Sequence, residues 1–411
     1  MSLSAAGLLE DLRERFFSPS SPETPLKIGV EVEVIPVHAS TRLPALPRGD
    51  GSAGISGTAR ILSELARSEG WVENVLENDP PSWTLSDGSC ISFEPGGQIE
   101  ISSAPHPTAS SVILGIRDLL TMIRDAMRIA GIDLVALGVD PCNDVDKVPL
   151  QLNRDRYVRM TRYFDSIGPS GIRMMRQTAA VQINVERGPD PVARWALLNA
   201  LAPYIVALFA NSRSYAGKTT GHASYRAHLW RTLDVSRTGL PFDSHDAAQR
   251  YLGFALDAGA MRSSDGSSPW LSFRDWMRLG NPTQSDWLFH LSTLFPEVRP
   301  KEFFEIRCAD AIESDSLAAP IVFVTGIAYD QTSALAARGL LGAASEALLE
   351  RAGRLGLSDP DIRRVTAKLV ALAVDGARRL GPGYISDADV DVARQFFERS
   401  LSARSAKSLP R

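Results

Sequence analysis

Four short segments of this chain alternate apolar residues with carboxylates, amides or an arginine. Successive side chains of a β-strand point to opposite faces, so each segment would place its apolar residues on one face of a sheet and its polar residues on the other. The apolar residues are mainly Val, Ile and Phe, which suit packing against helices. The segments are residues 30–34, 93–101 (interrupted by Pro-Gly-Gly), 181–185 and 304–308.

The polar faces of these segments carry an unusual set of side chains. Any one segment alone fits an ordinary solvated strand face. Such faces usually mix Thr, Ser, Lys and Glu, whereas this set is almost entirely Glu, Gln, Asn and Arg. Acids are depleted in strands and like charges destabilise a sheet when they face each other, so a cation is expected, with phosphate-handling divalent metal ions the leading candidate. The side chains project together as Glu31 with Glu33, Gln98 with Glu100, Gln182 with Asn184, and Glu305 with Arg307.

The bulk composition is that of a soluble globular protein. The chain has 411 residues, 22% of them charged, and a formal net charge of −4, without the basic excess that would suggest nucleic acid. No apolar run looks long enough to span a membrane, and residues 1–15 carry three acids and predict an amphipathic helix rather than a signal peptide. The three cysteines have no CxxC spacing. We therefore expect a cytoplasmic protein, monomeric or homodimeric, that binds neither nucleic acid nor membrane.

The order of the predicted elements indicates an α+β fold. Strands are scattered among helices without regular βαβ alternation, which predicts a curved, mainly antiparallel sheet with helices on its outer face and the site in its concavity. Residues 91–94 and 98–102 should form a hairpin through Pro-Gly-Gly. Because the acid-bearing strands run from Glu31 to Glu305, cutting the chain between them would divide the site. We expect one catalytic domain over residues 1–411, comprising a motif-bearing part (26–310), C-terminal helices that pack on it (334–402) and a disordered tail (403–411).

The carboxylates favour magnesium chemistry. Hard oxygen ligands suit Mg²⁺, which also keeps substrate phosphates in its shell, whereas no clustered His or Cys supports zinc. Arg307 shares a face with Glu305, so its guanidinium either bridges to a transferred phosphoryl group or neutralises that acid, and the two roles are compatible. The chain has no GxxxxGK[ST] motif, no GxGxxG that opens a helix and no GxSxG elbow. Any ATP would therefore bind to a metal-rich sheet.

One longer string carries a family resemblance. Residues 91–102, Ile-Ser-Phe-Glu-Pro-Gly-Gly-Gln-Ile-Glu-Ile-Ser, resemble the signature of the plant-type glutamate–cysteine ligases, which many bacteria also have. The resemblance extends from about residue 27 to residue 310, whereas the C-terminal helices match only in character. Further matching strings follow in the family's order at residues 27–33, 156–157, 178–184, 210–212, 217–221, 226–230, 234–239, 286–287, 290–299 and 304–310.

This resemblance implies a glutamine-synthetase-like ligase that uses ATP and two or three Mg²⁺ ions. The implied activity joins the γ-carboxylate of glutamate to the amine of cysteine, for glutathione or, as in actinobacterial relatives, ergothioneine biosynthesis. Arg307 would contact the transferred phosphoryl group with Glu305 beside it, and Lys218 the ATP phosphates. Arg226, with Asn184 and Arg156, would hold the amino acid's α-carboxylate. The implied metal ligands are Glu31, Glu33, Glu94, Glu100 and Glu305, with Gln182 lining the same face for substrate.

Two alternative functions stay open at this level. A related ligase could use the same phosphoryl chemistry to join glutamate, or another acid, to an amine other than cysteine. A protein of a different class could bind ATP and magnesium without catalysis and serve a partner. The complete set of acids argues against the second alternative, because ligands are usually lost first when an active site decays.

Overall fold

The computed structural model describes residues 3–21, 26–49, 57–241, 246–262, 270–342 and 345–402. Over these residues the chain forms a nine-stranded sheet in which each recorded pairing is antiparallel. The sheet order is β12-β13-β7-β1-β5-β4-β3-β2, and β6 pairs with the far end of β1. The strands are β1 (Ile28–His38), β2 (Val72–Asn74), β3 (Ser82–Thr84), β4 (Cys90–Phe93), β5 (Ile99–Ser102), β6 (Ile132–Val135), β7 (Ala180–Val185), β12 (Val298–Pro300) and β13 (Phe304–Asp310).

Two short ribbons lie outside this sheet. One pairs β8 (Ser214–Tyr215) with β9 (Lys218–Thr219) in an antiparallel hairpin. The other pairs β10 (Thr238–Gly239) with β11 (Phe295–Pro296) in parallel. The predicted hairpin of the Glu-Pro-Gly-Gly segment is confirmed, since β4 and β5 are adjacent and Gly97 takes a positive φ of 91° in the turn.

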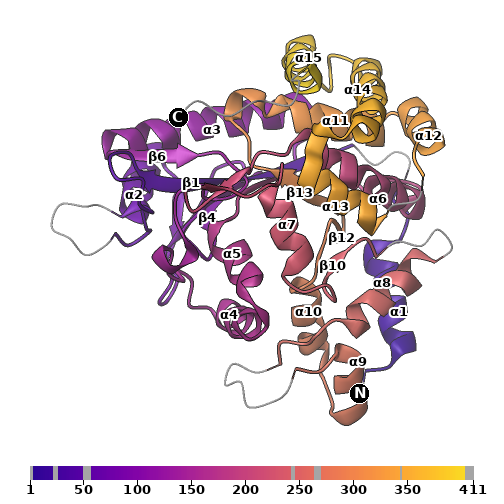
Figure 1. The fold of residues 1–411 in the computed structure, drawn as a ribbon, viewed down its shortest axis with the longest axis horizontal. Helices are drawn as coiled ribbons and strands as arrows, with labels where there is room; N and C mark the ends of the chain where they lie inside the picture. The colour runs from indigo at the N-terminus through magenta and orange to yellow at the C-terminus, as the bar shows by residue number, and fades with distance from the viewer. Residues whose placement is uncertain are drawn as a thin grey trace.

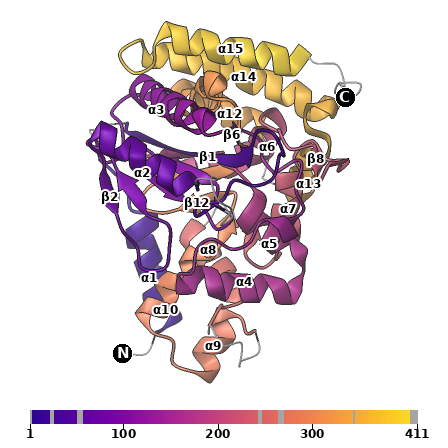
Figure 2. The same ribbon diagram turned by 90° about the vertical axis from the view of Figure 1, so that its left-hand side faces the viewer.

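Helices cover the apolar face of the sheet in two layers. α3 and α11 lie against the sheet, and α14 and α15 lie outside them, as Figures 1 and 2 show. Every residue of α11 is buried, so it is an internal helix with no solvated side. These outer-face helices are α3 (Ala109–Ile129), α11 (Ala318–Ala328), α14 (Pro360–Leu380) and α15 (Asp387–Ser402).

Most of the other helices surround the opposite, polar face and the ends of the sheet, whereas α12 packs on α11 and α14, and α6 packs on β13 beside them. α4, α5 and α7 lie below the sheet in Figure 1 and close over its concavity. The remaining helices are α1 (Ala5–Phe16), α2 (Thr58–Glu69), α4 (Asp155–Ile167), α5 (Pro169–Gln177), α6 (Pro191–Leu208), α7 (Tyr225–Thr232), α8 (Ala247–Asp257), α9 (Phe273–Leu279), α10 (Gln284–Ser292), α12 (Gln331–Leu340) and α13 (Glu346–Leu355). The α+β fold with an antiparallel sheet is thus confirmed.

The C-terminal region is helical, as predicted, but α13 does not stack with the other C-terminal helices. It packs instead on α6 and α7, while α14 packs on α11. Gly326 on α11 and Gly376 on α14 let these two helices approach closely, since a Cβ at Gly376 would meet the Gly326 carbonyl oxygen at 1.9 Å. The main hydrophobic core includes residues from Leu8 to Phe397. The predicted disordered tail, residues 403–411, lies outside the described residues, and the single-domain assignment stays a prediction.

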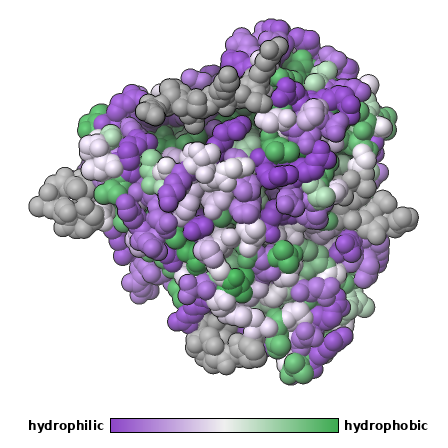
Figure 3. All heavy atoms as spheres, in the orientation of Figure 1, coloured by the Kyte–Doolittle hydropathy of each residue, from purple (hydrophilic) through white to green (hydrophobic). Residues whose placement is uncertain are grey.

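One helix of the described chain, α6, is long and apolar enough to cross a membrane by length and composition. This differs from the prediction, based on the sequence, that no apolar run is long enough to span a membrane. Within the fold, 72% of that helix segment is buried, and it packs on β13 and α13. On the face drawn in Figure 3, hydrophobic residues lie in small groups among hydrophilic ones. The environment of α6 is therefore that of a core helix.

Candidate active site

The strand register gathers the predicted polar residues on one face of the sheet. Glu31 on β1 lies opposite Gln182 on β7, and Glu33 lies directly opposite Glu100 on β5. Farther along β7, Asn184 lies opposite Glu305 on β13. The alternation therefore predicted correctly which side chains share a face, including a like-charge pair across neighbouring strands.

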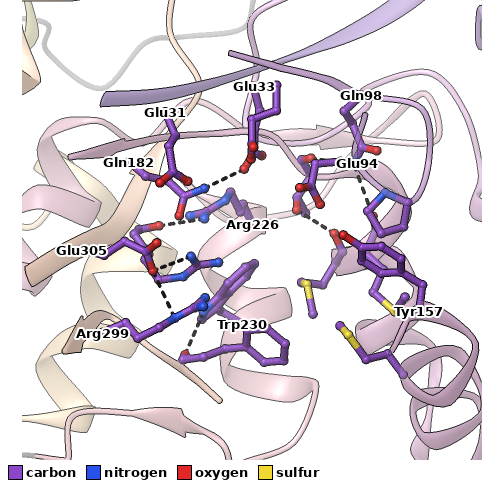
Figure 4. Close-up of a pocket in the computed structure, with 18 of the residues that line it drawn as sticks. Glu31, Glu33, Glu94, Gln98, Tyr157, Gln182, Arg226, Trp230, Arg299 and Glu305 are labelled. Atoms are coloured by element: carbon purple, nitrogen blue, oxygen red, sulfur yellow. Dashed lines mark hydrogen bonds and ion pairs between the residues drawn. The ribbon is translucent and has the colours of Figure 1, made fainter. Parts of the chain in front are cut away.

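Apart from Asn184, these side chains line a cavity of about 170 Å³ with three chemically distinct walls. Figure 4 shows Glu31, Glu33 and Glu94 above the open space, Arg299 and Glu305 at the lower left, and Tyr157 at the right. We call the walls the acid wall, the cation wall and the apolar wall. The acid wall is Glu31, Glu33, Glu94 and Glu100; the cation wall is Arg226, Arg299, Lys301 and Arg307, with Glu305 among them; the apolar wall is Tyr157, Met160, Met174, Met175, Trp230 and Phe295.

The acid wall lacks enough positive charge to ionise fully. Burial, followed by the charge of Glu100, raises the pKa of Glu33 from 4.5 to about 8. Burial and Glu33 together raise the pKa of Glu94 to about 7. Burial and Glu94 raise the pKa of Glu100 well above its ordinary value. At neutral pH Glu33 therefore holds a proton and Glu94 does so in part, unless a cation replaces the proton, and the pKa of Glu100 is shifted in the same direction.

Two amide oxygens beside the acid wall have no hydrogen-bond partner among the described residues. Gln182 Nε2 donates to Glu33 at 2.9 Å and Asn184 Nδ2 donates to Glu31 at 3.0 Å, which leaves both amide oxygens directed elsewhere. Within the described part of the chain, neither amide oxygen has a hydrogen-bond partner although both are buried. A set of carboxylate and amide oxygens with unmet demand for positive charge fits Mg²⁺. Among the described residues no three acidic, His or Cys side chains converge tightly enough to hold an ion as they stand.

Glu305 has a different environment from the other acids. Its carboxylate contacts Arg299 at 3.1 Å, Lys301 at 2.5 Å and Arg307 at 2.8 Å. Although burial opposes ionisation, these three cations hold the pKa of Glu305 well below its usual range. The salt bridge between Arg307 and Glu305, considered as an alternative from the sequence, is present. The metal role of Glu305 stays a prediction, and its oxygens already have cationic partners.

Arg226 enters the cavity from the first turn of α7. Ser224 caps this helix, and its hydroxyl donates to Asp310 at 2.9 Å, while Ser212 donates to the same carboxylate at 2.7 Å. The Arg226 backbone N–H in turn donates to the Ser212 hydroxyl. The Arg226 guanidinium lies 4.5 Å from the Trp230 ring, a cation–π contact. A buried carboxylate and two hydroxyls thus fix the position of this arginine.

Of the other residues predicted to bind substrate or ATP, one lines the cavity, one lies at its edge and one lies outside it. Arg156, on α4, lines the cavity, and its Nη2 donates to the Ser292 carbonyl at 2.9 Å. Asn184 lies at the edge, in contact with Glu31 but outside the cavity lining. Lys218 lies apart from the other predicted residues, because it is exposed on β9 and the cavity lining does not include it.

Gln98 lines the cavity and also stabilises the hairpin turn between β4 and β5. Its Oε1 accepts from Gly96 N at 2.9 Å and its Nε2 donates to the Thr178 carbonyl at 2.8 Å. The turn is tight here, since a Cβ at Gly96 would meet the Arg176 carbonyl oxygen at 1.9 Å. Gln98 therefore stabilises the hairpin that carries Glu94 and Glu100. A side chain at Gly96 would clash with Arg176, and the positive φ of Gly97 favours glycine there.

Sequence reasoning gave no role to Arg299 and Lys301, nor to the apolar wall. The signal for the first two was limited to the density of charge at residues 299, 301, 305 and 307, because the period-2 rule does not carry across the turn between β12 and β13. No comparable signal existed for the methionines, which occur in helices and look like ordinary core residues. Tyr157, Trp230 and Phe295 fell within the matching strings without being assigned a function.

A family model and individual relatives all match this chain to glutamate–cysteine ligases. The family model described as glutamate-cysteine ligase family 2 (GCS2) matches residues 27–396. The glutamate–cysteine ligase EgtA of Mycolicibacterium smegmatis is 33% identical over 334 residues, which cover 77% of this chain and 77% of that protein. The chloroplastic glutamate–cysteine ligase of Arabidopsis thaliana is 30% identical over 397 residues, which cover 90% of this chain and 74% of that protein.

Solved structures give more distant similarities. The glutamate–cysteine ligase of Francisella tularensis in complex with AMP is 12% identical, with a TM-score of 0.44, over 94% of this chain and 90% of that one. The extent of the family match and the identity to both relatives settle the family. The chain belongs to glutamate–cysteine ligase family 2.

Proposed function

We propose that the protein joins the γ-carboxylate of glutamate to the amine of cysteine with ATP, giving γ-glutamylcysteine, ADP and phosphate. The observation that carries this proposal is the meeting of the acid wall and the cation wall at one cavity. The γ-carboxylate and ATP are both anionic, so their reaction needs positive charge on either side of the transferred phosphoryl group. A carboxylate is also a poor acyl donor, and phosphorylation supplies its leaving group.

The first step forms γ-glutamyl phosphate. A γ-carboxylate oxygen attacks the terminal phosphorus of ATP, and the bond to ADP breaks. Bound magnesium would act as Lewis acid and template for the phosphates, held by Glu31, Glu33, Glu94 and Glu100 with Gln182 beside them. In the second step the cysteine amine attacks the acyl carbon and phosphate leaves.

The cation wall would stabilise the negative charge on the phosphoryl group in the transition state of its transfer. Arg307 is the central group, and Arg299 and Lys301 share its carboxylate partner. Sequence reasoning included Glu305 among the metal ligands. Its three cationic contacts favour a role in orienting this wall, because a carboxylate held between cations fixes their donors in advance of the reaction.

Arg226 would bind the α-carboxylate of the substrate. It is buried, and its backbone N–H donates to the Ser212 hydroxyl. Arg156 and Asn184 are the weaker candidates for the same task. Lys218 would take part only if ATP extends from the cavity to the β8–β9 hairpin. We further propose that the product enters glutathione or ergothioneine synthesis, because relatives of both kinds are similar to this chain. We propose a cytoplasmic location because the three cysteines are all free thiols, which suits a reducing compartment.

The proposal is tested by phosphate release from ATP and Mg²⁺ in the presence of glutamate, cysteine, both or neither. Release that requires both amino acids, with γ-glutamylcysteine identified by mass spectrometry, is the expected result. An amide product with another amine of a panel, but not with cysteine, would leave the ligase class standing and replace the acceptor. ATP binding without amino-acid-dependent turnover would favour the non-catalytic alternative.

A further inference from the structure

The apolar wall is the part of the cavity that phosphoryl chemistry does not explain. Met160 on α4 and Met174 and Met175 on α5 are only 3%, 7% and 3% exposed, yet all three line the cavity. They belong to a hydrophobic cluster that is separate from the main core, together with Trp230 and Phe295. Figure 4 shows methionine sulfur atoms beside Tyr157, across the open space from Arg299 and Glu305.

Several polar groups next to this wall are already bonded within the protein. The Trp230 indole donates to the Phe295 carbonyl at 3.1 Å. The Thr178 hydroxyl donates to the Met174 carbonyl at 2.7 Å, and the Gln98 amide donates to the Thr178 carbonyl. A side chain that lies against the methionines would therefore meet mainly polarizable thioethers and aromatic rings. Two donors beside it, the Tyr157 hydroxyl and the Arg156 Nε–H at the start of α4, have no hydrogen-bond partner among the described residues.

The reactants divide among the three walls by charge. ATP, the γ-carboxylate of the donor and its α-carboxylate are anionic, so they belong to the acid wall with its metal ions and to the cation wall. The adenine of ATP is uncharged as well, but the triphosphate separates it from the phosphoryl group that is transferred. Among the reactant groups in this cavity, the side chain of the acceptor is therefore the one without a charged counterpart. Burying a charged side chain against the methionines would be strongly unfavourable, and a hydroxyl would lose its hydrogen bonds to water.

We infer that Met160, Met174 and Met175 form the subsite for the acceptor's side chain and select a small, uncharged, weakly hydrogen-bonding group such as a thiol. This inference rests on the proposed ligase function and adds the residues that set its acceptor preference. A thiol gives up little on leaving water and gains dispersion contacts with the thioethers. Serine has the same shape with a strongly hydrated hydroxyl, so it is the sharpest comparison.

The test measures kcat/KM for cysteine and for serine in the wild-type enzyme and in variants. An apolar pocket discriminates against an added hydroxyl by roughly a hundredfold, so serine should be the poorer acceptor by about that factor. Met174→Gln and Met160→Gln keep the length of the side chain and supply a donor and an acceptor. Each should narrow the cysteine-to-serine ratio by about tenfold, while the KM for glutamate stays within twofold of its wild-type value.

Met261→Gln is the matched control, because Met261 is 2% exposed in the same cluster but does not line the cavity. It should lower thermal stability as the other variants do and leave the cysteine-to-serine ratio unchanged. Met174→Leu preserves volume and polarity, so it should fold and keep the ratio within threefold of wild type.

The outcomes separate this inference from the proposed function. If the wild-type enzyme makes no amide with cysteine, the proposed acceptor is wrong. If it does so, but the lining variants leave the ratio unchanged, or Met174→Leu or Met261→Gln shifts it as far as Met174→Gln does, the methionines do not select the side chain and the inference is overturned.

Discussion

Replacing Glu33 by glutamine should remove part of the pH dependence of stability in the metal-free protein. Burial and the neighbouring Glu100 raise the pKa of Glu33 from 4.5 to about 8. Because the pKa of the folded state lies above that of the unfolded state, the associated stability is fully present below about pH 4.5. It is lost as the pH rises through the folded-state pKa, and the loss is complete only above about pH 8.

The size of the effect follows from the pKa change. A rise from 4.5 to about 8 corresponds to about 5 kcal/mol, at about 1.4 kcal/mol per pKa unit, and about 4 kcal/mol of this falls between pH 5 and pH 8.5. For a chain of 411 residues, an unfolding entropy of about 2.1 cal/mol/K per residue gives about 0.9 kcal/mol/K. Glu33 alone should therefore lower Tm by about 4 °C over this pH range.

Calorimetric melting of the wild type and of Glu33→Gln at pH 5 and pH 8.5, in EDTA and in excess MgCl₂, measures this difference. In EDTA, Glu33→Gln should lose about 4 °C less than the wild type on going to pH 8.5. Magnesium should raise the Tm of the wild type more than that of the variant, because it replaces the missing positive charge. Glu69→Gln, at an exposed position of α2, serves as the control and should behave as wild type.

Equal losses of Tm in the wild type, Glu33→Gln and Glu69→Gln would refute the reasoning. So would a magnesium-induced rise of Tm in Glu33→Gln as large as that in the wild type. Either result would mean that the protein itself compensates the acid wall and that this wall does not call for an external cation.

Substitutions at three further positions probe the acid wall and the cation wall. Glu100→Gln should abolish turnover and leave the fold intact, and a circular dichroism spectrum of an unfolded protein would make Glu100 a structural residue instead. Arg307→Ala should lower kcat by roughly a hundredfold to a thousandfold, with partial recovery in Arg307→Lys, because lysine keeps the charge and loses the two-pronged geometry. A normal kcat for Arg307→Ala at saturating ATP would leave Arg307 only as a partner of Glu305. Arg226→Ala should raise the KM for glutamate more than it lowers kcat, since an α-carboxylate clamp acts in ground and transition states alike, and steady-state kinetics with the opposite split would contradict that role.

Local periodicity was sufficient to predict the sheet face and most of the acid wall. A strand's period of two fixes which side chains project together, and the Pro-Gly-Gly turn fixes that β4 and β5 are neighbours. Glu33 and Glu100 could therefore be assigned to one face without knowledge of the register. Their direct opposition depends on the pairing of β1 with β5, which the sequence alone does not specify.

The remaining features depend on contacts between distant segments. The three cations around Glu305 come from β12, β13 and the turn between them, so their convergence requires the folded hairpin. Buried methionines on α4 and α5 have the same pattern whether a helix covers a core or a cavity. Lys218 shows the converse case, since a residue in a matching string lies outside the cavity lining.

The burial of α11 has a consequence for how the chain is synthesised. Ribosomes release the strands of the acid wall first and β13, with Glu305 and Arg307, much later. Immediately afterwards comes α11, a helix that is apolar on every side and that is covered by α14 and α15 only when the final segment has emerged. Until then the nascent protein has all the strands of the nine-stranded sheet and an uncovered apolar helix, a combination that favours aggregation and chaperone binding. A ribosome-stalled or truncated product that ends between α11 and α14 should therefore be far less soluble than either a shorter or a complete chain.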